Sequence, residues 1–284
     1  MPSPNPQRVL SLSCPDAPGI VHAVSGAIAR AGGNIVESQQ FGDPSSGRFF
    51  MRVQMEAVLD GHSLGTAISD VAADFAMDWN LDTVGRPTRT LIMVSKAPHC
   101  LHDLLYRRSQ EHLPIDVAAV VSNHTDLAEV AAFYSVPFHH LPVTPETRGA
   151  SEEMLLALIR SLDVELVVLA RYMQILSARV CDALPGRVIN IHHSFLPSFK
   201  GARPYVQAYR RGVKLIGATA HYVTTNLDEG PIIEQDVERV THADHAAELV
   251  ALGEDVERRA LARAVRWHAE HRILINDGRT VVFR

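Results

Sequence analysis

Asn190 and His192 are two polar residues, two positions apart, in the otherwise apolar segment 188–192. If this segment is a β-strand, residues two apart point to the same side, so the amide and the imidazole share one face. A strand covered on both faces should be apolar, and burying either side chain without hydrogen bonds costs roughly 1–3 kcal/mol. A satisfied polar network in the core is the alternative, but two such residues at the end of the segment favour a functional site. Both side chains can donate hydrogen bonds to the oxyanion that forms when a carbonyl is attacked.

A carboxylate follows in a polar loop between two apolar segments. Asp228 stands just before Gly230 and Pro231, between segments 215–222 and 232–236, which we expect to be strands. A carboxylate can position an imidazole or a water molecule and can move protons during a reaction. Acidic residues are also common in turns next to glycine. Spacing alone does not place Asp228 beside His192.

The elements that would position these residues lie between residues 87 and 284, where apolar segments alternate with amphipathic ones. This alternation predicts an α/β fold with a mostly parallel sheet, in which ligands bind at the carboxyl ends of the strands. Besides the segments named above, we expect strands at 91–94, 117–121, 138–141, 166–169 and 279–283, and helices at 100–110, 126–134 (capped by Asp126), 151–161, 177–184 and 244–271.

Residues 1–86 form a separate, smaller unit that ends near Gly85-Arg86-Pro87. The expected elements are a strand at 9–12, a helix at 20–31, strands at 35–41 and 49–58, a helix at 63–75 and a strand at 79–84. Glycine at 32 and 33 ends the first helix, because glycine tolerates a left-handed cap. The order β-α-β-β-α-β predicts a ferredoxin-like unit.

The composition of the 284-residue chain argues against several classes of partner. The net charge of -5 and the absence of a Lys/Arg run give no sign of nucleic-acid binding. No stretch approaches the ~18 apolar residues of a membrane helix, and the first ten residues do not resemble a secretory signal. The three cysteines are odd in number and far apart, which favours reduced thiols in the cytoplasm.

The chain has 15 histidines, so a metal site has to be considered. Three pairs are spaced three residues apart and could share a helical face: His99/His102, His242/His245 and His268/His271. None has a cysteine partner in the pattern of a zinc site, and only His245 is followed by a carboxylate, Glu248, at the same spacing. We interpret all three pairs as surface or structural residues and expect no metal.

Three segments in matching order resemble the signature of the formyl transferases that use 10-formyltetrahydrofolate: Asn190–His192, Ser194–Pro197 and Leu227–Pro231. The resemblance runs from about Thr88 to the C-terminus and implies a Rossmann-like formyltransferase domain over 87–284. It implies that Asn190, His192 and Asp228 are the catalytic trio. It also implies 10-formyltetrahydrofolate as the substrate, with no permanently bound cofactor. The residues expected to contact the folate are Arg171, Met173, Gln174, Leu176, His221, Thr224 and Leu227. His221 would either orient Asp228 or pack between strands, and His193 should face the opposite side of its strand.

The first unit resembles an ACT domain over about residues 7–84, on the segments Asp16–Val21 and Gly33–Ile35. A turn with free amides at a helix N-terminus can hold the carboxylate of a small amino acid. The resemblance therefore implies an amino-acid effector, bound by Asp16, Gly19, Ile20 and Asn34, and a homo-oligomer, either a dimer or a tetramer. Alternatively, Asp16 merely caps the helix.

The nucleophile has to be identified separately. The turn after the expected strand 91–94 lacks glycine, and Pro98 removes an amide, so a cradle for a phosphate-bearing acceptor is poorly supported. An ACT-like unit joined to a formyltransferase-like domain resembles the formyltetrahydrofolate deformylases, in which water is the nucleophile, and segment 200–205 looks like that group. A transferase with a small amine acceptor and a non-catalytic folate or amino-acid binder remain the alternatives.

Overall fold

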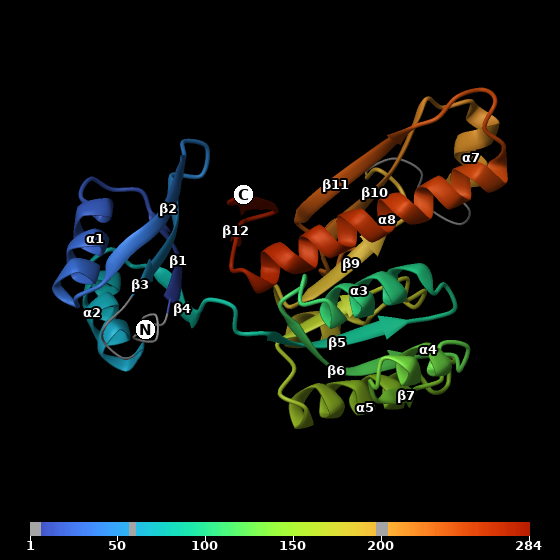
Figure 1. Cartoon of the computed structure of the whole chain (residues 1–284), viewed down its shortest axis with the longest axis horizontal. Helices are drawn as coiled ribbons and strands as arrows, with labels where there is room; N and C mark the ends of the chain where they lie inside the picture. The colour runs from blue at the N-terminus through green and yellow to red at the C-terminus, as the bar shows by residue number, and fades with distance from the viewer. Residues whose placement is uncertain (1–6, 57–60, 197–203) are drawn as a thin grey trace. The chain divides into compact units, whose positions relative to one another are not determined.

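The computed structural model describes residues 7–56, 61–196 and 204–284. The chain divides into two compact units (Figure 1): Met1–Arg86 together with Glu270–Arg284, and Pro87–Ala269. The first change of unit falls between Arg86 and Pro87. The sequence places residues 270–284 with the second domain, whereas the segment Glu270–Arg284 groups with the first unit.

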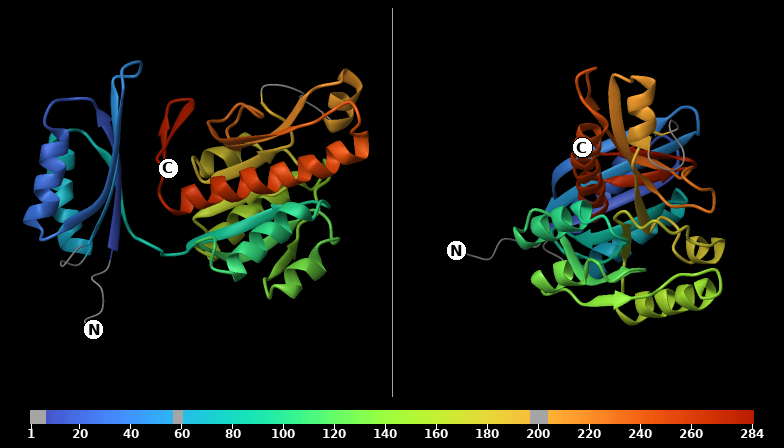
Figure 2. Two further views of the ribbon diagram at one scale, coloured as in Figure 1. Left: turned by 45° about the horizontal axis from the view of Figure 1, so that its top comes forward. Right: turned by 90° about the vertical axis from the view of Figure 1, so that its right-hand side faces the viewer.

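The first unit is a four-stranded antiparallel sheet with two helices. Its strand order is β2-β3-β1-β4, and both helices pack on the same face (Figure 2). Leu10, Val24, Ile28, Met51 and Ile68 belong to the buried core between helices and sheet. The order confirms the ferredoxin-like fold. The elements are β1 (Gln7–Pro15), α1 (Ile20–Arg30), β2 (Asn34–Asp43), β3 (Arg48–Glu56), α2 (Gly61–Asp74) and β4 (Asp78–Thr83).

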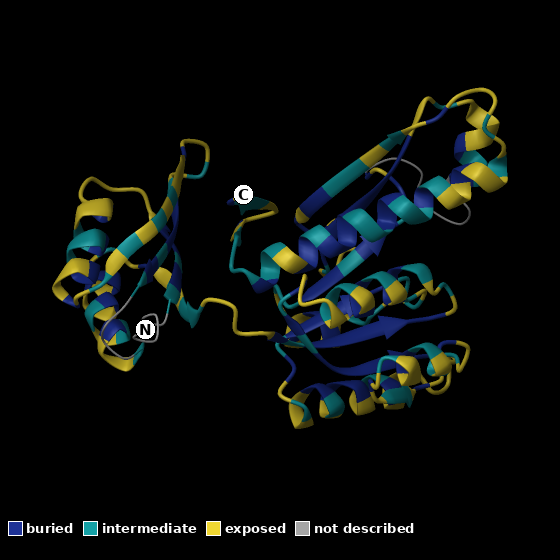
Figure 3. Ribbon diagram, in the orientation of Figure 1, coloured by how far each residue is buried: buried dark blue, intermediate teal, exposed yellow. Residues whose placement is uncertain are grey.

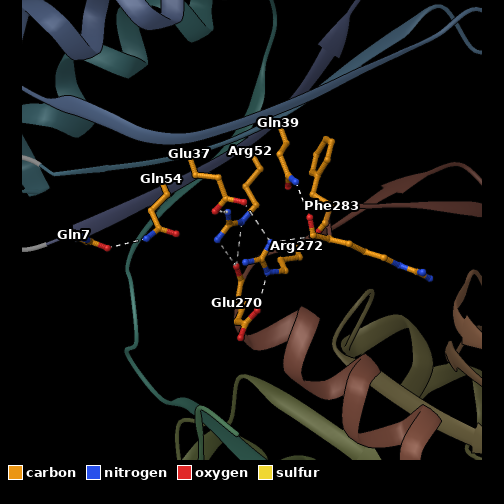
Figure 4. Close-up of polar contacts among 9 residues, drawn as sticks. Gln7, Glu37, Gln39, Arg52, Gln54, Glu270, Arg272 and Phe283 are labelled. Atoms are coloured by element: carbon orange, nitrogen blue, oxygen red, sulfur yellow. Dashed lines mark hydrogen bonds and ion pairs between the residues drawn. The ribbon is translucent and has the colours of Figure 1, made fainter. Parts of the chain in front are cut away.

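The C-terminal segment joins this unit through polar contacts (Figure 4). It forms a hairpin of β12 (Ile273–Asn276) and β13 (Arg279–Val282), of which the sequence predicted only the second strand. Arg52 of β3 is 2% exposed; its guanidinium donates to the Glu270 carbonyl oxygen at 3.2 and 3.3 Å and pairs with Glu37 at 3.0 Å. Asn276 donates to the Asp43 carboxylate at 2.6 Å. Moving the segment away would leave the buried Arg52 cation without the Glu270 carbonyl acceptor, which is costly. These contacts therefore hold the segment in place.

The second unit is built on a seven-stranded sheet of order β11-β10-β9-β8-β5-β6-β7. The pairs from β9 through β8, β5 and β6 to β7 are parallel, whereas β10 is antiparallel to both of its neighbours, β9 and β11, which confirms a mostly parallel sheet. The central strands are buried (Figure 3). Its strands are β5 (Thr88–Val94), β6 (Ile115–Ser122), β7 (Phe138–His140), β8 (Leu166–Leu169), β9 (Val188–His192), β10 (Leu215–Tyr222) and β11 (Ile232–Arg239).

The helices of this unit depart from expectation at three places. Helix α4 begins after Leu127 with no side-chain cap, so Asp126 is not its cap. Helix α5 starts at Arg148 rather than at Ser151, whose hydroxyl donates to the Pro142 carbonyl oxygen at 2.8 Å. Helix α7 was not predicted. The helices are α3 (His99–Ser109), α4 (Ala128–Phe133), α5 (Arg148–Ser161), α6 (Ala178–Ala183), α7 (Pro204–Arg211) and α8 (Ala246–Ala269). Within the described part of the chain, every helix is too short or too polar to cross a lipid bilayer.

Candidate active site

The register between β9 and β10 places a histidine opposite Asn190. These strands are antiparallel, with Asn190 across from His221 and His192 across from Thr219. The Asn190 amide nitrogen lies 3.2 Å from His221 Nε2, and His221 Nδ1 lies 2.9 Å from the Tyr222 carbonyl oxygen. Because a carbonyl only accepts, Nδ1 carries the proton. Burial lowers the pKa of His221, so the ring is neutral and its Nε2 accepts from the Asn190 amide. One N–H of that amide remains for a ligand.

Asp228 lies next to His192. The Asp228 Oδ2 atom is 3.3 Å from His192 Nδ1, and the second carboxylate oxygen is 3.8 Å from His221 Nε2. The hydrogen bond from His192 lowers the pKa of Asp228 and keeps the carboxylate ionised. Asp228 has a φ of 56°, a left-handed conformation that is uncommon for a residue with a side chain. His192 Nε2 is buried without a partner in the described chain, so it is available to a bound substrate. His221 therefore contacts Asn190 more closely than Asp228.

A cavity of about 230 Å³ opens beside this trio. Its wall includes Asn190, His192 and Asp228 and every residue for which the sequence predicted folate contact: Arg171, Met173, Gln174, Leu176, His221, Thr224 and Leu227. Folate binding by these residues stays a prediction. The resemblance points to the whole segments 171–176 and 224–228, which include Tyr172, Ile175, Thr225 and Asn226 of the same cavity wall. Val223, which also lines the cavity, was not expected there.

His193 also lines the cavity, contrary to the expectation that it faces away from His192. The two rings lie 5.1 Å apart between centroids. Strand β9 ends at His192, so the strict alternation of side chains no longer applies at the next residue. The predicted strand also ends at His192, so the wrong expectation came from extending the alternation of side chains to the residue after the strand.

The segment after β8, residues 171–176, is fixed from the neighbouring strands. The Met173 amide donates to the Ser95 hydroxyl at 3.0 Å, and that hydroxyl donates to the Asn123 side-chain oxygen at 2.7 Å. Arg171 has a φ of 65°, which turns the chain sharply after the strand. Sequence reasoning missed Ser95 and Asn123. Ser95 and Asn123 are polar residues that directly follow apolar strands at their carboxyl ends. The same pattern pointed to Asn190 and His192, and it could have identified Ser95 and Asn123.

The histidine pairs considered as metal ligands have different surroundings. His268 hydrogen-bonds to the Tyr222 hydroxyl at 2.7 Å, and His271 lies 3.2 Å from Asp82. Ligand atoms of His99, Cys100 and Glu257 lie within 4.8 Å of one another, a grouping with a cysteine that the spacing did not reveal.

Of the residues predicted to bind an effector, Asp16, Gly19 and Ile20 lie around the start of α1. Asn34 begins β2 across from Glu56, at the opposite end of the sheet, so the structure does not bring it together with them. Gly19, at a φ of 97°, is the N-cap residue, and no side chain caps this helix, so Asp16 is not its cap. Ile20 is 2% exposed and belongs to the core of the first unit. Asp16 and Asn34 are exposed. The segment 200–205 compared with the deformylases begins outside the described residues, which resume at Pro204.

His193 predicts a pH dependence of stability. Burial, with the nearby Arg171 cation, lowers the pKa of His193 from 6.5 to about 4. Between these values the unfolded chain binds a proton that the folded protein does not, so the free energy of unfolding falls as the pH drops through that window. The contribution is at most about 3 kcal/mol. We expect His193→Gln to flatten the decrease in Tm between pH 7 and 4.5, with His22→Gln on the exposed side of α1 as the control. An unchanged slope in His193→Gln would contradict this assignment.

The comparisons with known proteins cover both units. The formyl transferase family model matches residues 88–265, and the ACT domain model matches residues 8–73. A formyltetrahydrofolate deformylase of Corynebacterium sp. (strain P-1) is 51% identical over 98% of both chains. The crystal structure of a formyltetrahydrofolate deformylase from Burkholderia mallei, 49% identical, superposes with a TM-score of 0.95 over 98% of this chain and 100% of that one. A glycinamide ribonucleotide transformylase from Symbiobacterium toebii, 32% identical, covers 72% of this chain and 98% of its own with a TM-score of 0.66.

Proposed function

The chain belongs to the formyltetrahydrofolate deformylase family, and from that premise we propose that it hydrolyses 10-formyltetrahydrofolate to formate and tetrahydrofolate in the cavity beside Asn190, His192 and Asp228. The observation that carries the proposal is the pairing of His192 with an ionised Asp228, which leaves the buried His192 Nε2 free at the cavity wall. The Asn190 amide is held beside it by His221.

The reaction needs stabilisation of an oxyanion and transfer of a proton. A water oxygen attacks the formyl carbon and gives a proton to Asp228, while the carbonyl π electrons move to the formyl oxygen. The remaining Asn190 N–H and His192 Nε2–H, the latter in the imidazolium that Asp228 stabilises, donate to this oxyanion. The carbon–nitrogen bond then breaks, and Asp228 returns the proton to the departing N10. The products are tetrahydrofolate and formic acid, which ionises to formate.

Geometry around the start of α3 supports water rather than a phosphate-bearing acceptor. Pro98 is the N-cap residue of this helix and supplies no amide hydrogen there. The side chain of His99 is already bound to Glu257, with His99 Nε2 2.8 Å from the carboxylate. This turn therefore offers one backbone amide fewer to an acceptor phosphate, which favours water as the nucleophile.

The direct test is formate release from 10-formyltetrahydrofolate with no amine present. Steady multiple turnover supports the hydrolase. Turnover that begins only when an amine is supplied would indicate a transferase, and folate binding without any turnover would indicate a regulator.

For the ACT unit, the exposed turn at Asp16 and Gly19 supports an amino-acid effector at the start of α1, with contacts from Asp16 and the Gly19 backbone; Asn34, at the other end of the sheet, would not contact the same molecule. Calorimetric titration with the common amino acids tests this proposal, and no binding heat with any of them would contradict it.

We also expect a homo-oligomer, a dimer or tetramer, which light scattering measures. Three free, buried cysteines support a cytoplasmic enzyme, which cell fractionation checks.

A further inference from the structure

Glu257 is a buried acid outside the trio. Its side chain is 1% exposed, in the middle of α8, in a segment that sequence reasoning treated only as a helix. Burial alone would favour the neutral acid, but a hydrogen bond from His99 and the charge of Arg171 keep the pKa of Glu257 below its ordinary value. A buried carboxylate is retained only where partners compensate its desolvation.

The partners of Glu257 come from three segments that are far apart in the sequence. The His99 Nε2 atom at the start of α3 lies 2.8 Å from one carboxylate oxygen, and the Tyr205 hydroxyl at the start of α7 donates to the other at 2.7 Å. Arg171 Nε, in the segment that lines the folate cavity, lies 3.4 Å away. We propose that Glu257 is a positioning residue of the hydrolase: its carboxylate fixes these three segments and balances the Arg171 charge beside His193. The proposal rests on the proposed function.

Helix α8 is shaped to admit Tyr205. Gly253 lies four residues before Glu257, on the same helical face. A Cβ atom at position 253 would lie 2.1 Å from the Tyr205 ring and 2.5 Å from its hydroxyl oxygen. Only glycine leaves room for the ring to reach the carboxylate. Gly253 thus gives a second observation for the same arrangement, independent of charge.

The Arg171 charge gives Glu257 an electrostatic role. Arg171 Nη1 is buried without a hydrogen-bond partner in the described chain, so Glu257 is its close counter-ion. Arg171 also acts on His193, whose ring lies 5.1 Å from that of His192. Without the Glu257 charge, the Arg171 cation would be uncompensated beside His193, whose ring lies next to that of His192, and an added positive charge there works against the His192 imidazolium of the proposed mechanism.

A cation site formed by His99, Cys100 and Glu257 is the competing interpretation of this cluster. The ligand atoms are close enough, but the Arg171 cation already neutralises the carboxylate. Burial raises the pKa of the Cys100 thiol well above its ordinary range, and a thiol must lose its proton to bind a metal. The cluster is therefore arranged as a hydrogen-bonded network.

The main test is Glu257→Gln, which keeps the shape and removes the charge. We expect kcat for formate release to fall about 100-fold in the folded protein, as for a misplaced catalytic group. We also expect the alkaline limb of the kcat/KM profile to move to lower pH, because a cation is left unbalanced. Arg171→Met/Glu257→Gln removes both charges and should return this limb toward its original pH. Asp255→Asn, on the same helix with its side chain half exposed and paired only with the Arg258 cation among the ion pairs of the described residues, is the matched control.

Two milder variants keep the proposal testable if Glu257→Gln does not fold. Tyr205→Phe removes one hydroxyl and should lower kcat about 10-fold, with the pH profile unmoved because the charges remain. Gly253→Ala should lower kcat similarly by displacing the Tyr205 ring. A folded Glu257→Gln with kcat within about twofold of the parent and an unmoved profile overturns the proposal. The proposal is also overturned if the whole loss of activity is explained by the fraction of unfolded protein measured by circular dichroism.

Failure of this inference is separable from failure of the proposed function. The parent enzyme is assayed first, and if it releases no formate without an amine, the hydrolase proposal fails. If the parent turns over and Glu257→Gln equals it, only the role of Glu257 fails. Tetrahydrofolate binding, followed by protein fluorescence, gives a readout independent of turnover. Unchanged binding in Glu257→Gln with reduced kcat supports positioning of the reacting groups.

Discussion

Asp228→Asn should lower kcat for formate release by about three decades while changing tetrahydrofolate affinity by less than about threefold. The substitution keeps the size of the side chain and its place beside His192, 3.3 Å away in the parent. It removes the charge that stabilises the His192 imidazolium and the group that carries the proton from water to N10. Because both losses affect the transition state more than the bound folate, the effect falls on kcat rather than on binding.

The measurement for this variant is single-turnover formate release together with a binding titration. Glu229→Gln is the matched control, since Glu229 is the adjacent carboxylate and is exposed. We expect the control to keep the parent rate. A folded Asp228→Asn that retains more than about a tenth of the parent kcat would remove Asp228 from the mechanism.

Two members of the proposed catalytic trio, Asn190 and His192, could be predicted from the sequence because their signals are local. Asn190 and His192 are two residues apart in an apolar strand, and this spacing alone puts them on one face. Their place at the carboxyl end follows from the parallel sheet, which the alternation of elements predicts. Asp228 required the resemblance to the formyl transferases, because no spacing rule connects a loop after β10 with the end of β9.

The partners of the trio were not accessible, because they depend on strand register and tertiary packing. His221 meets Asn190 only because β10 runs antiparallel to β9 in one particular register. In the sequence, Glu257 is one of many charged residues in a predicted helix. Its partners become identifiable only in the fold, where α8 packs against the start of α3 and Tyr205. Strand β12 was not predicted for the same reason, because its four residues form a strand by pairing with β13, which follows them in the hairpin.

Gly230→Ala is expected to damage both stability and catalysis, because Gly230 closes the loop that carries Asp228. A Cβ atom at this position would lie 1.8 Å from the Tyr222 carbonyl oxygen, closer than any non-bonded contact allows. The base of the loop is fixed here, since the Tyr222 amide donates to the Pro231 carbonyl oxygen at 2.9 Å. The backbone must therefore shift at one of the two strands, and overpacking of this kind costs about 1–3 kcal/mol.

The same shift would move Asp228 relative to His192. Asp228 is two residues from Gly230 and already has an uncommon backbone conformation, so a displaced loop end changes its position directly. A misplacement of about 1 Å costs roughly 100-fold in rate. Thermal unfolding and kcat measured below Tm separate the two effects. Gly149→Ala, in the first turn of α5 with open space around its Cβ, is the control and should be neutral or slightly stabilising. If folded Gly230→Ala keeps the parent kcat, the position of Asp228 does not depend on this close approach, and the loop is held by the His192 contact instead.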